Sequence, residues 1–318
     1  MTQTPAIRVI GRRLLQAAPV LVLATFIVFG LLKLLPGDVA VTLAGDNATD
    51  QRIEEIRRIY GLDRPFLVQY AAWLWKAVHG DLSQSILSGE AVLVSIARCF
   101  PHTLLIVAMA LLLALAVGVP LGVLAATRPD RFVDRAVMAI ASVGIAIPNF
   151  WLAMILVSLF ALKWNIFPAT GAVAFAQSPA DAIWHAILPS LALAAGGMAE
   201  VARQVRGSLL DILSSQFVRT LRAKGLKPST ILWKHGLKNV AVNLLTVTGL
   251  LFNRLLAATV VVEAVFAIPG MGNLIVHAAI QRDFTVVQGV VFAMVIVVIL
   301  VNLVTDLLCS IVDPRIGR

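Results

Sequence analysis

Six long apolar stretches limit what this chain can fold into. They lie at about 14–35, 102–126, 136–162, 186–206, 241–265 and 286–310. Each is long enough to cross the hydrocarbon core of a bilayer, which takes about 20 residues of α-helix. Because 59% of the 318 residues are hydrophobic and only 14% are charged, the chain has too little polar surface to enclose a water-soluble core. The sequence therefore predicts an all-α membrane protein with six transmembrane helices.

The fourth and fifth stretches are less uniformly apolar than the others. In the fourth, small residues stand at 194–197 (Ala-Ala-Gly-Gly). Small residues within a membrane span usually mark close packing against a neighbouring helix. We therefore count both stretches as spans and expect close helix packing at these positions.

Lysine and arginine lie almost entirely on one side of the expected spans. With the N-terminus inside, the cytoplasmic segments hold Arg8, Arg12, Arg13, Arg128, Arg131, Arg135, Arg203, Arg206, Arg219, Arg222, Lys224, Lys227, Lys234, Lys238, Arg315 and Arg318. The two short outer connections hold essentially only Lys163 and Arg282. Since positive charge concentrates in cytoplasmic loops, both termini are predicted to be cytoplasmic. The net charge of +9 is therefore interpreted as contact with membrane lipid, and nucleic-acid binding is not expected.

The connection at 36–101 is too long for a turn and is expected outside the membrane. Within it, 50–60 (DQRIEEIRRIY) has apolar residues on one helical face and is followed by Gly61, which predicts a short helix with a glycine end. A second amphipathic run, PFLVQYAAWLWKAV, carries Trp73 and Trp75, residues that suit a membrane interface. We expect two short helices on the outer face.

The connection at 203–240 is basic and is expected in the cytoplasm. The fourth span is expected to continue into it, followed by a short helix at about 216–224 that stops at Gly225, where glycine can adopt the left-handed conformation of a helix cap. A second helix is expected to start near Pro228 and to lead into the fifth span. The short helix can seat in a groove of a soluble partner or lie against anionic lipid headgroups, and the residues alone leave both interpretations open.

The chain lacks the motifs that usually carry catalysis. It contains no phosphate-binding loop of the form G-x-x-x-x-G-K-[ST], and neither H-E-x-x-H nor G-x-S-x-G occurs. The five histidines are scattered over different segments, and Cys99 and Cys309 form no C-x-x-C pair. We therefore expect no catalytic residue, no metal site and no cofactor bound by this chain, and we do not expect an enzyme.

Several ordered motifs resemble one family of transport proteins. The cytoplasmic connection reads FVRTLRAKGL and then KHGLKN, which is similar to the EAA-type loop of ABC importer permeases of the dipeptide, oligopeptide and nickel branch. The same branch is resembled by LLKLLPGD, YGLDRPFLVQYAAWLWKAVHGDL, GIAIPNFWLA, VVVEAVFAIPGMGNLIVHAAIQRDFTVVQG and VNLVTDLLCSIVDPRIGR. The resemblance covers about 8–315.

This resemblance implies a type I ABC importer permease fold in a bacterial inner membrane. The implied parts are an N-terminal helix with an external loop at 1–96, a permease domain at 97–307 and a cytoplasmic tail at 308–318. The implied partners are a second homologous permease, two ATP-binding subunits that bind the ATP, and an external solute-binding protein. Peptides are the expected cargo, with nickel or another small solute as the alternative. A secondary transporter that works without ATP is the rival from another class.

The resemblance also assigns a coupling motif that contacts the ATPase. It comprises Arg219, Thr220, Leu221, Arg222, Ala223, Lys224 and Gly225. The usual Glu-Ala-Ala opening falls here on Arg-Thr-Leu, whereas the glycine is kept. The proline that usually ends the motif is replaced by Asn243, which leaves the angle at which the fifth span begins open.

Polar residues of the last two spans are candidates for the translocation path. They are Asn253, Arg254, Glu263, Asn302 and Asp306. Arg254 lies near the middle of its span with no evident partner on the same helix, so it is expected either to face the path, where it can bind a cargo carboxylate, or to pair with a group on a neighbouring helix. Glu263 and Asp306 could carry the ion coupling of a secondary transporter, but their positions favour solvation at helix ends.

Overall fold

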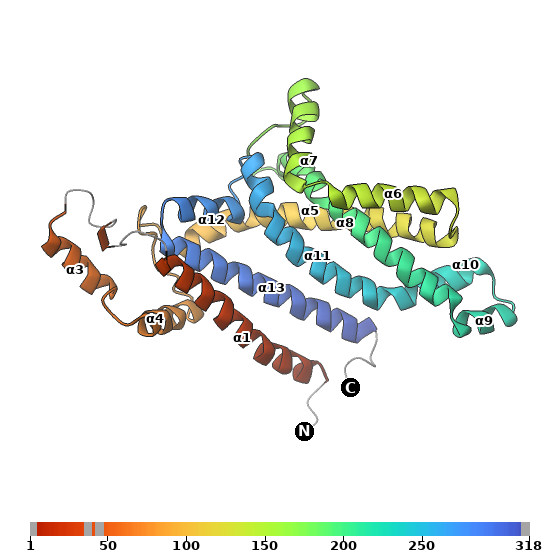
Figure 1. Ribbon diagram of the computed structural model, residues 1–318, viewed down its shortest axis with the longest axis horizontal. Coiled ribbons are helices and arrows are strands. Elements are labelled where there is room, and N and C mark those ends of the chain that lie inside the picture. The colour runs from red at the N-terminus through yellow and green to blue at the C-terminus, as the bar shows by residue number, and fades with distance from the viewer. Residues whose placement is uncertain (1–4, 35–39, 42–47, 313–318) are drawn as a thin grey trace. The chain divides into compact units, whose positions relative to one another are not determined.

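The computed structural model describes residues 5–34, 40–41 and 48–312, and these are almost entirely helical (Figure 1). The N-terminal part contains α1 (Pro5–Leu34), α3 (Asp50–Tyr60) and α4 (Phe66–Val78). The other elements, in chain order, are α5 (Val92–Thr127), α6 (Phe132–Ala146), α7 (Asn149–Leu156), the π-helix η1 (Val157–Lys163), α8 (Pro179–Ser214), α9 (Gln216–Ala223), α10 (Pro228–Thr230), the π-helix η2 (Ile231–Gly236), α11 (Leu237–Val265), α12 (Met271–Ile280) and α13 (Phe284–Val312). The predicted all-α fold is confirmed.

Five helical segments of the described chain are long and apolar enough to cross a membrane. They are Leu15–Leu32 within α1, then α5, α8, the run Pro228–Val265 and α13. The pair formed by α6 and the α7–η1 segment gives a sixth if both halves belong to one span. The prediction of an integral membrane protein with about six spans is therefore confirmed.

The third predicted span is broken rather than straight. Its two halves meet at an angle of 95°, and Figure 1 shows α7 turning away from the direction of α6. The break lies at Ile147, whose backbone is extended (φ −78°, ψ 122°), and at Pro148, which has no N–H to donate. A proline also disfavours helical backbone in the residue before it. The candidate span predicted over 136–162 is therefore bent at this point.

The chain divides into two compact units. The larger unit comprises Pro101–Gly272 together with segments from both ends of the chain, and the smaller unit comprises Ile10–Phe100 and Asn273–Leu300. Each unit has its own buried side chains.

In the larger unit, α8 packs against α6, α7 and α11. Small residues permit this packing. A Cβ atom added to Gly118 or Gly122 of α5 would come within 2.8 Å of Val201 or Val205 on α8. At Gly197, an added Cβ would lie 3.2 Å from Ala114 and from Leu251. The close packing that the small residues of the fourth span predicted is confirmed.

In the smaller unit, aromatic rings join α1 to α4. The ring of Phe26 meets Tyr70 edge-on at 5.2 Å, and the Tyr70 hydroxyl donates to the Val22 carbonyl oxygen at 2.8 Å. Both predicted short helices are present, and α3 ends at Gly61 with φ +64°. Trp73 is buried against Phe292 of α13, so only the exposed Trp75 is available for the expected interfacial role.

Candidate functional site

The short helix α9 is defined by a signal at each end. At its start, the Ser215 hydroxyl oxygen accepts a hydrogen bond from the Val218 N–H at 3.5 Å. At its end, Gly225 adopts φ +77°. The Gly225 N–H donates to the Arg222 carbonyl at 2.9 Å, and the Leu226 N–H donates to the Leu221 carbonyl at 3.2 Å. These two bonds form a Schellman cap, so the predicted left-handed stop at Gly225 is confirmed.

One face of α9 is buried and the other is open. Val218 is fully buried and Leu221 is half-buried. The other residues of the coupling motif are exposed, namely Arg219, Thr220, Arg222, Ala223, Lys224 and Gly225. Figure 1 shows α9 turning off the end of α8, beside α10. The larger unit therefore presents a short, basic helix surface at one end.

The segment that follows α9 leads directly into the fifth span. Pro228 stands in the first turn of α10, as predicted, because its missing N–H needs no partner there. The helical run then continues through η2 into α11. Asn243, which replaces the usual proline, is inside α11, and its side-chain N–H₂ donates to the Ser208 hydroxyl on α8 at 2.7 Å. The sequence leaves open the angle at which the fifth span begins. In the structure, a continuous helical run with a π-helical turn leads into this span, and the hydrogen bond from Asn243 fastens it to α8.

Arg254 of α11 pairs with Glu200 of α8. Both residues lie within segments apolar enough to span a membrane. The side chain of Arg254 is 55% exposed and that of Glu200 is 31% exposed. Arg254 therefore has a partner on a neighbouring helix, and Glu200 is a residue that sequence reasoning missed. Glu200 could have been singled out from the sequence, because it is an acidic residue inside the fourth predicted span.

Two of the other path candidates lie close together. The Asn253 side-chain N–H₂ donates to the Asn302 side-chain carbonyl of α13 at 2.9 Å. Asn302 is exposed, and Asp306, one turn further along α13, is half-buried. Among the described residues, no group of three or more His, Cys, Asp or Glu side chains is placed to hold a metal ion.

Glu263 is buried rather than solvated. The Thr103 hydroxyl donates to a carboxylate oxygen of Glu263 at 2.6 Å and accepts a hydrogen bond from the Met271 N–H at 2.8 Å. A Cβ atom at Gly270 or Gly272 would collide with the Glu263 carboxylate. The expectation that Glu263 is solvated at a helix end is wrong, because the segment after α11 folds back over the carboxylate and covers it.

A second ion pair joins α6 to α8. The Arg206 guanidinium donates to both carboxylate oxygens of Asp134, at 2.5 and 2.6 Å. One of those oxygens also accepts from the Asp130 N–H at 2.9 Å. Asp134 is buried, so this pair fixes the start of α6 against α8. From the sequence alone, Arg206 is expected only to add to the positive charge of the cytoplasmic side.

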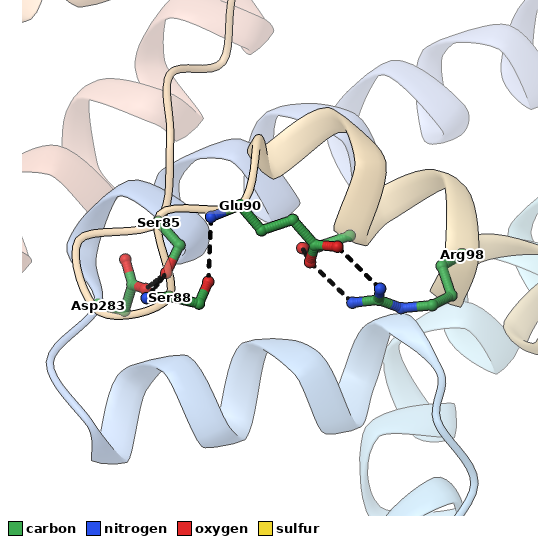
Figure 2. Close-up of polar contacts among 6 residues, drawn as sticks. Ser85, Ser88, Glu90, Arg98 and Asp283 are labelled. Carbon is green, nitrogen blue, oxygen red and sulfur yellow. Dashed lines mark hydrogen bonds and ion pairs between the residues drawn. The ribbon is translucent and has the colours of Figure 1, made fainter.

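The smaller unit holds a polar cluster in the first turns of α5 and in the segments that precede α5 and α13 (Figure 2). The Ser85 hydroxyl donates to Asp283 at 2.5 Å, which ties the segment before α5 to the segment before α13. Glu90 accepts two hydrogen bonds from Arg98, both at 2.8 Å, and one from Ser95. The hydrogen bond from Arg98 is the main reason that the pKa of Glu90 lies below its ordinary value. This cluster was not foreseen from the sequence.

Comparisons with known proteins agree with this architecture. The family described as "Binding-protein-dependent transport system inner membrane component" matches residues 118–318, and its N-terminal counterpart matches residues 6–108. A putative peptide transport system permease protein of Brucella abortus is 38% identical over 96% of this chain and 97% of its own length. The oligopeptide transport system permease protein AppB of Bacillus subtilis is 37% identical, over 96% and 98%. The glutathione transport system permease protein GsiC of Escherichia coli is 38% identical, over 96% and 97%.

A solved structure shares the fold. An inward-facing structure of the MetNI methionine ABC transporter superposes with a TM-score of 0.58, over 70% of this chain and 97% of the matched chain, at 23% sequence identity. At that identity the likeness concerns the fold alone. The family match extends over most of the sequence, and the relatives match nearly all of it. This chain belongs to the family of inner membrane components of binding-protein-dependent transport systems, whose members are transport permeases and not enzymes.

Proposed function

We propose that this chain is the membrane-spanning permease subunit of an ATP-driven importer of peptides. The observation that carries the proposal is α9, a short capped helix with a buried anchor at Val218 and an exposed basic face at the end of the larger unit. The chain has no phosphate-binding loop of its own, which is consistent with ATP being bound by another subunit. In this proposal α9 is the coupling helix and seats in a groove of the ATP-binding subunit.

The proposed assembly has two permeases, two ATP-binding subunits and an external solute-binding protein. Both termini and the 203–240 connection lie in the cytoplasm in this arrangement, and 36–101 and 267–285 lie outside. Closure of the ATP-binding subunits moves α9 and, through α8 and α11, alternates access to the path. Residues 219–225 transmit the motion, and Asn253, Arg254, Asn302 and Asp306 are the candidates for the path, whereas the buried Glu263 is not.

Peptides are the proposed cargo because the relatives are named for peptide, oligopeptide and glutathione transport. Nickel or another small solute is the alternative cargo. A direct test is to purify the chain from its native membrane with its associated proteins and to identify the ligand of the co-purifying binding protein. The proposal expects an ATP-binding subunit in the complex and a peptide on the binding protein. A binding protein that carries nickel or a sugar would overturn the cargo, and a complex without an ATP-binding subunit would overturn the mechanism.

A further inference from the structure

The ion pair between Arg254 and Glu200 occupies an unusual position. Arg254 lies about 16 Å along the helix axis from Val265, the last residue of α11, and the hydrocarbon core is about 30 Å thick. Charged side chains at such a depth are rare and usually face a bundle interior or a water-filled cavity. Yet more than half of the Arg254 side chain is exposed in this chain. The pair therefore faces water or a partner subunit rather than lipid.

The neighbouring exposed residues support this assignment. Asn243 and Thr246 lie on the same exposed face of α11 as Arg254, where the apolar side chains of Leu250 and Val261 are exposed as well. Asn302 of α13 is bonded to the adjacent Asn253. The exposed face of α1 is quite different and has the composition of a lipid-facing surface, with Leu15, Val20, Leu23, Ile27 and Leu31. The exposed face of α11 thus mixes polar and apolar side chains, which suits a path for peptides, and the ion pair lies within it.

Other contacts also hold α8 against α11. Gly197 of α8 already packs closely on Leu251 of α11, and Asn243 donates to Ser208 further along the same two helices. A guanidinium beside a carboxylate also has a specific chemical use. It offers one group that binds carboxylates in a planar, two-bond geometry and one that binds ammonium groups.

We propose that Arg254 and Glu200 form a binding site for the charged ends of a zwitterionic peptide. The guanidinium takes the terminal carboxylate of the cargo, and the carboxylate of Glu200 takes the terminal ammonium. Each charge then exchanges one partner for another, so no charge is left uncompensated within the membrane as cargo enters and leaves. This inference rests on the proposed function, and it names the chemical class that the path recognises.

The test uses the complete transporter, reconstituted in vesicles with ATP and with binding protein saturated by a labelled tripeptide that has free ends. The variants are Glu200→Gln, Arg254→Gln and the double variant Glu200→Gln/Arg254→Gln. Loss of a charge-assisted hydrogen bond to cargo is expected to lower uptake roughly tenfold or more in each single variant. The double variant should remain at least as slow as the singles, because it has no charge with which to bind either end.

A pair that only fastens two helices behaves differently, because replacing both charges by amides removes the uncompensated charge and restores function. The matched control is the pair that joins α8 to α6, Arg206 and the buried Asp134, for which Asp134→Asn/Arg206→Gln should recover much of the uptake that either single variant loses. Membrane content and ATPase co-purification are measured for every variant. Uptake near the wild-type level in Glu200→Gln/Arg254→Gln, or in both singles, would overturn the binding site. Failure of the wild-type transporter to import any peptide would instead overturn the proposed function.

Discussion

At the scale of single residues, Glu263 shows how the larger unit holds a carboxyl group away from solvent. Thr103 is central to this arrangement, since its hydroxyl donates to Glu263 and accepts from the Met271 backbone. Both Thr103 and Glu263 are fully buried. Through these two hydrogen bonds, the Thr103 hydroxyl links α5 to α11 and to the start of α12.

Replacement of Thr103 by valine keeps the shape of the side chain but removes the hydroxyl. The Met271 N–H then has no acceptor in a buried site, which should destabilise the protein by about 1–3 kcal/mol. The midpoint of thermal unfolding in detergent measures this effect. The matched control is Thr248→Val, because the Thr248 hydroxyl donates only within its own helix, to Leu244 at 2.7 Å. Equal melting temperatures for the wild type and Thr103→Val would show that the contact contributes nothing.

Glu90 gives a pH-dependent prediction. Hydrogen bonds from Arg98 and then Ser95 favour its carboxylate form, so its pKa is lowered from the ordinary 4.5. The stability that these bonds contribute is therefore fully present when the pH is above the ordinary pKa of a glutamate. It is lost as the pH falls through the lowered pKa that Glu90 has in the folded protein. The difference in melting temperature between the wild type and Glu90→Gln should be constant down to about pH 5 and should shrink below about pH 4. Arg98→Gln should give the same profile, and a difference that persists unchanged at acid pH would contradict this account.

At the scale of the element, α9 depends on the backbone of Gly225. No atom lies within 4 Å of a Cβ added there, so substitution acts through the positive φ and not through a clash. Gly225→Val should weaken the helix end by at least about 1–2 kcal/mol. Insertion into the membrane should be retained, whereas co-purification of the ATP-binding subunit and uptake should fall.

Two variants control for the Gly225→Val result. Gly207→Val places the same side chain at another glycine with open space around its Cβ, within helix α8, and should have little effect. Gly225→Asn should be tolerated better than valine, because asparagine adopts the left-handed conformation more readily. Full co-purification and uptake by Gly225→Val would remove α9 as the coupling element.

The elements also show what a sequence can predict. The ends of α3 and α9 were foreseen because a glycine cap is a local signal that depends on a few adjacent residues. The bend between α6 and α7 was missed, since hydropathy records that a segment is apolar and not whether it is straight. The pairing of Glu200 with Arg254 was missed for a related reason, because spacing along one helix does not indicate which residue of another helix lies beside it.

At the scale of the whole molecule, the topology is the first property to test. Reporter fusions after Arg58 and after Lys227 are expected to report opposite sides, with Arg58 outside and Lys227 in the cytoplasm. The physical reason is the excess of lysine and arginine in the segments assigned to the cytoplasm. If both fusions report the same side, the number of spans between them differs from the number proposed.

The central claim is that the chain transports peptide by using ATP bound to a partner. The most direct measurement is uptake of a labelled peptide into vesicles that contain the purified complex, with binding protein outside and ATP enclosed on the side of the ATP-binding subunit. The account predicts accumulation against a gradient that requires ATP and the binding protein together and that continues when ionophores remove every ion gradient. Accumulation that needs an ion gradient and proceeds without ATP would contradict it and would favour a secondary transporter.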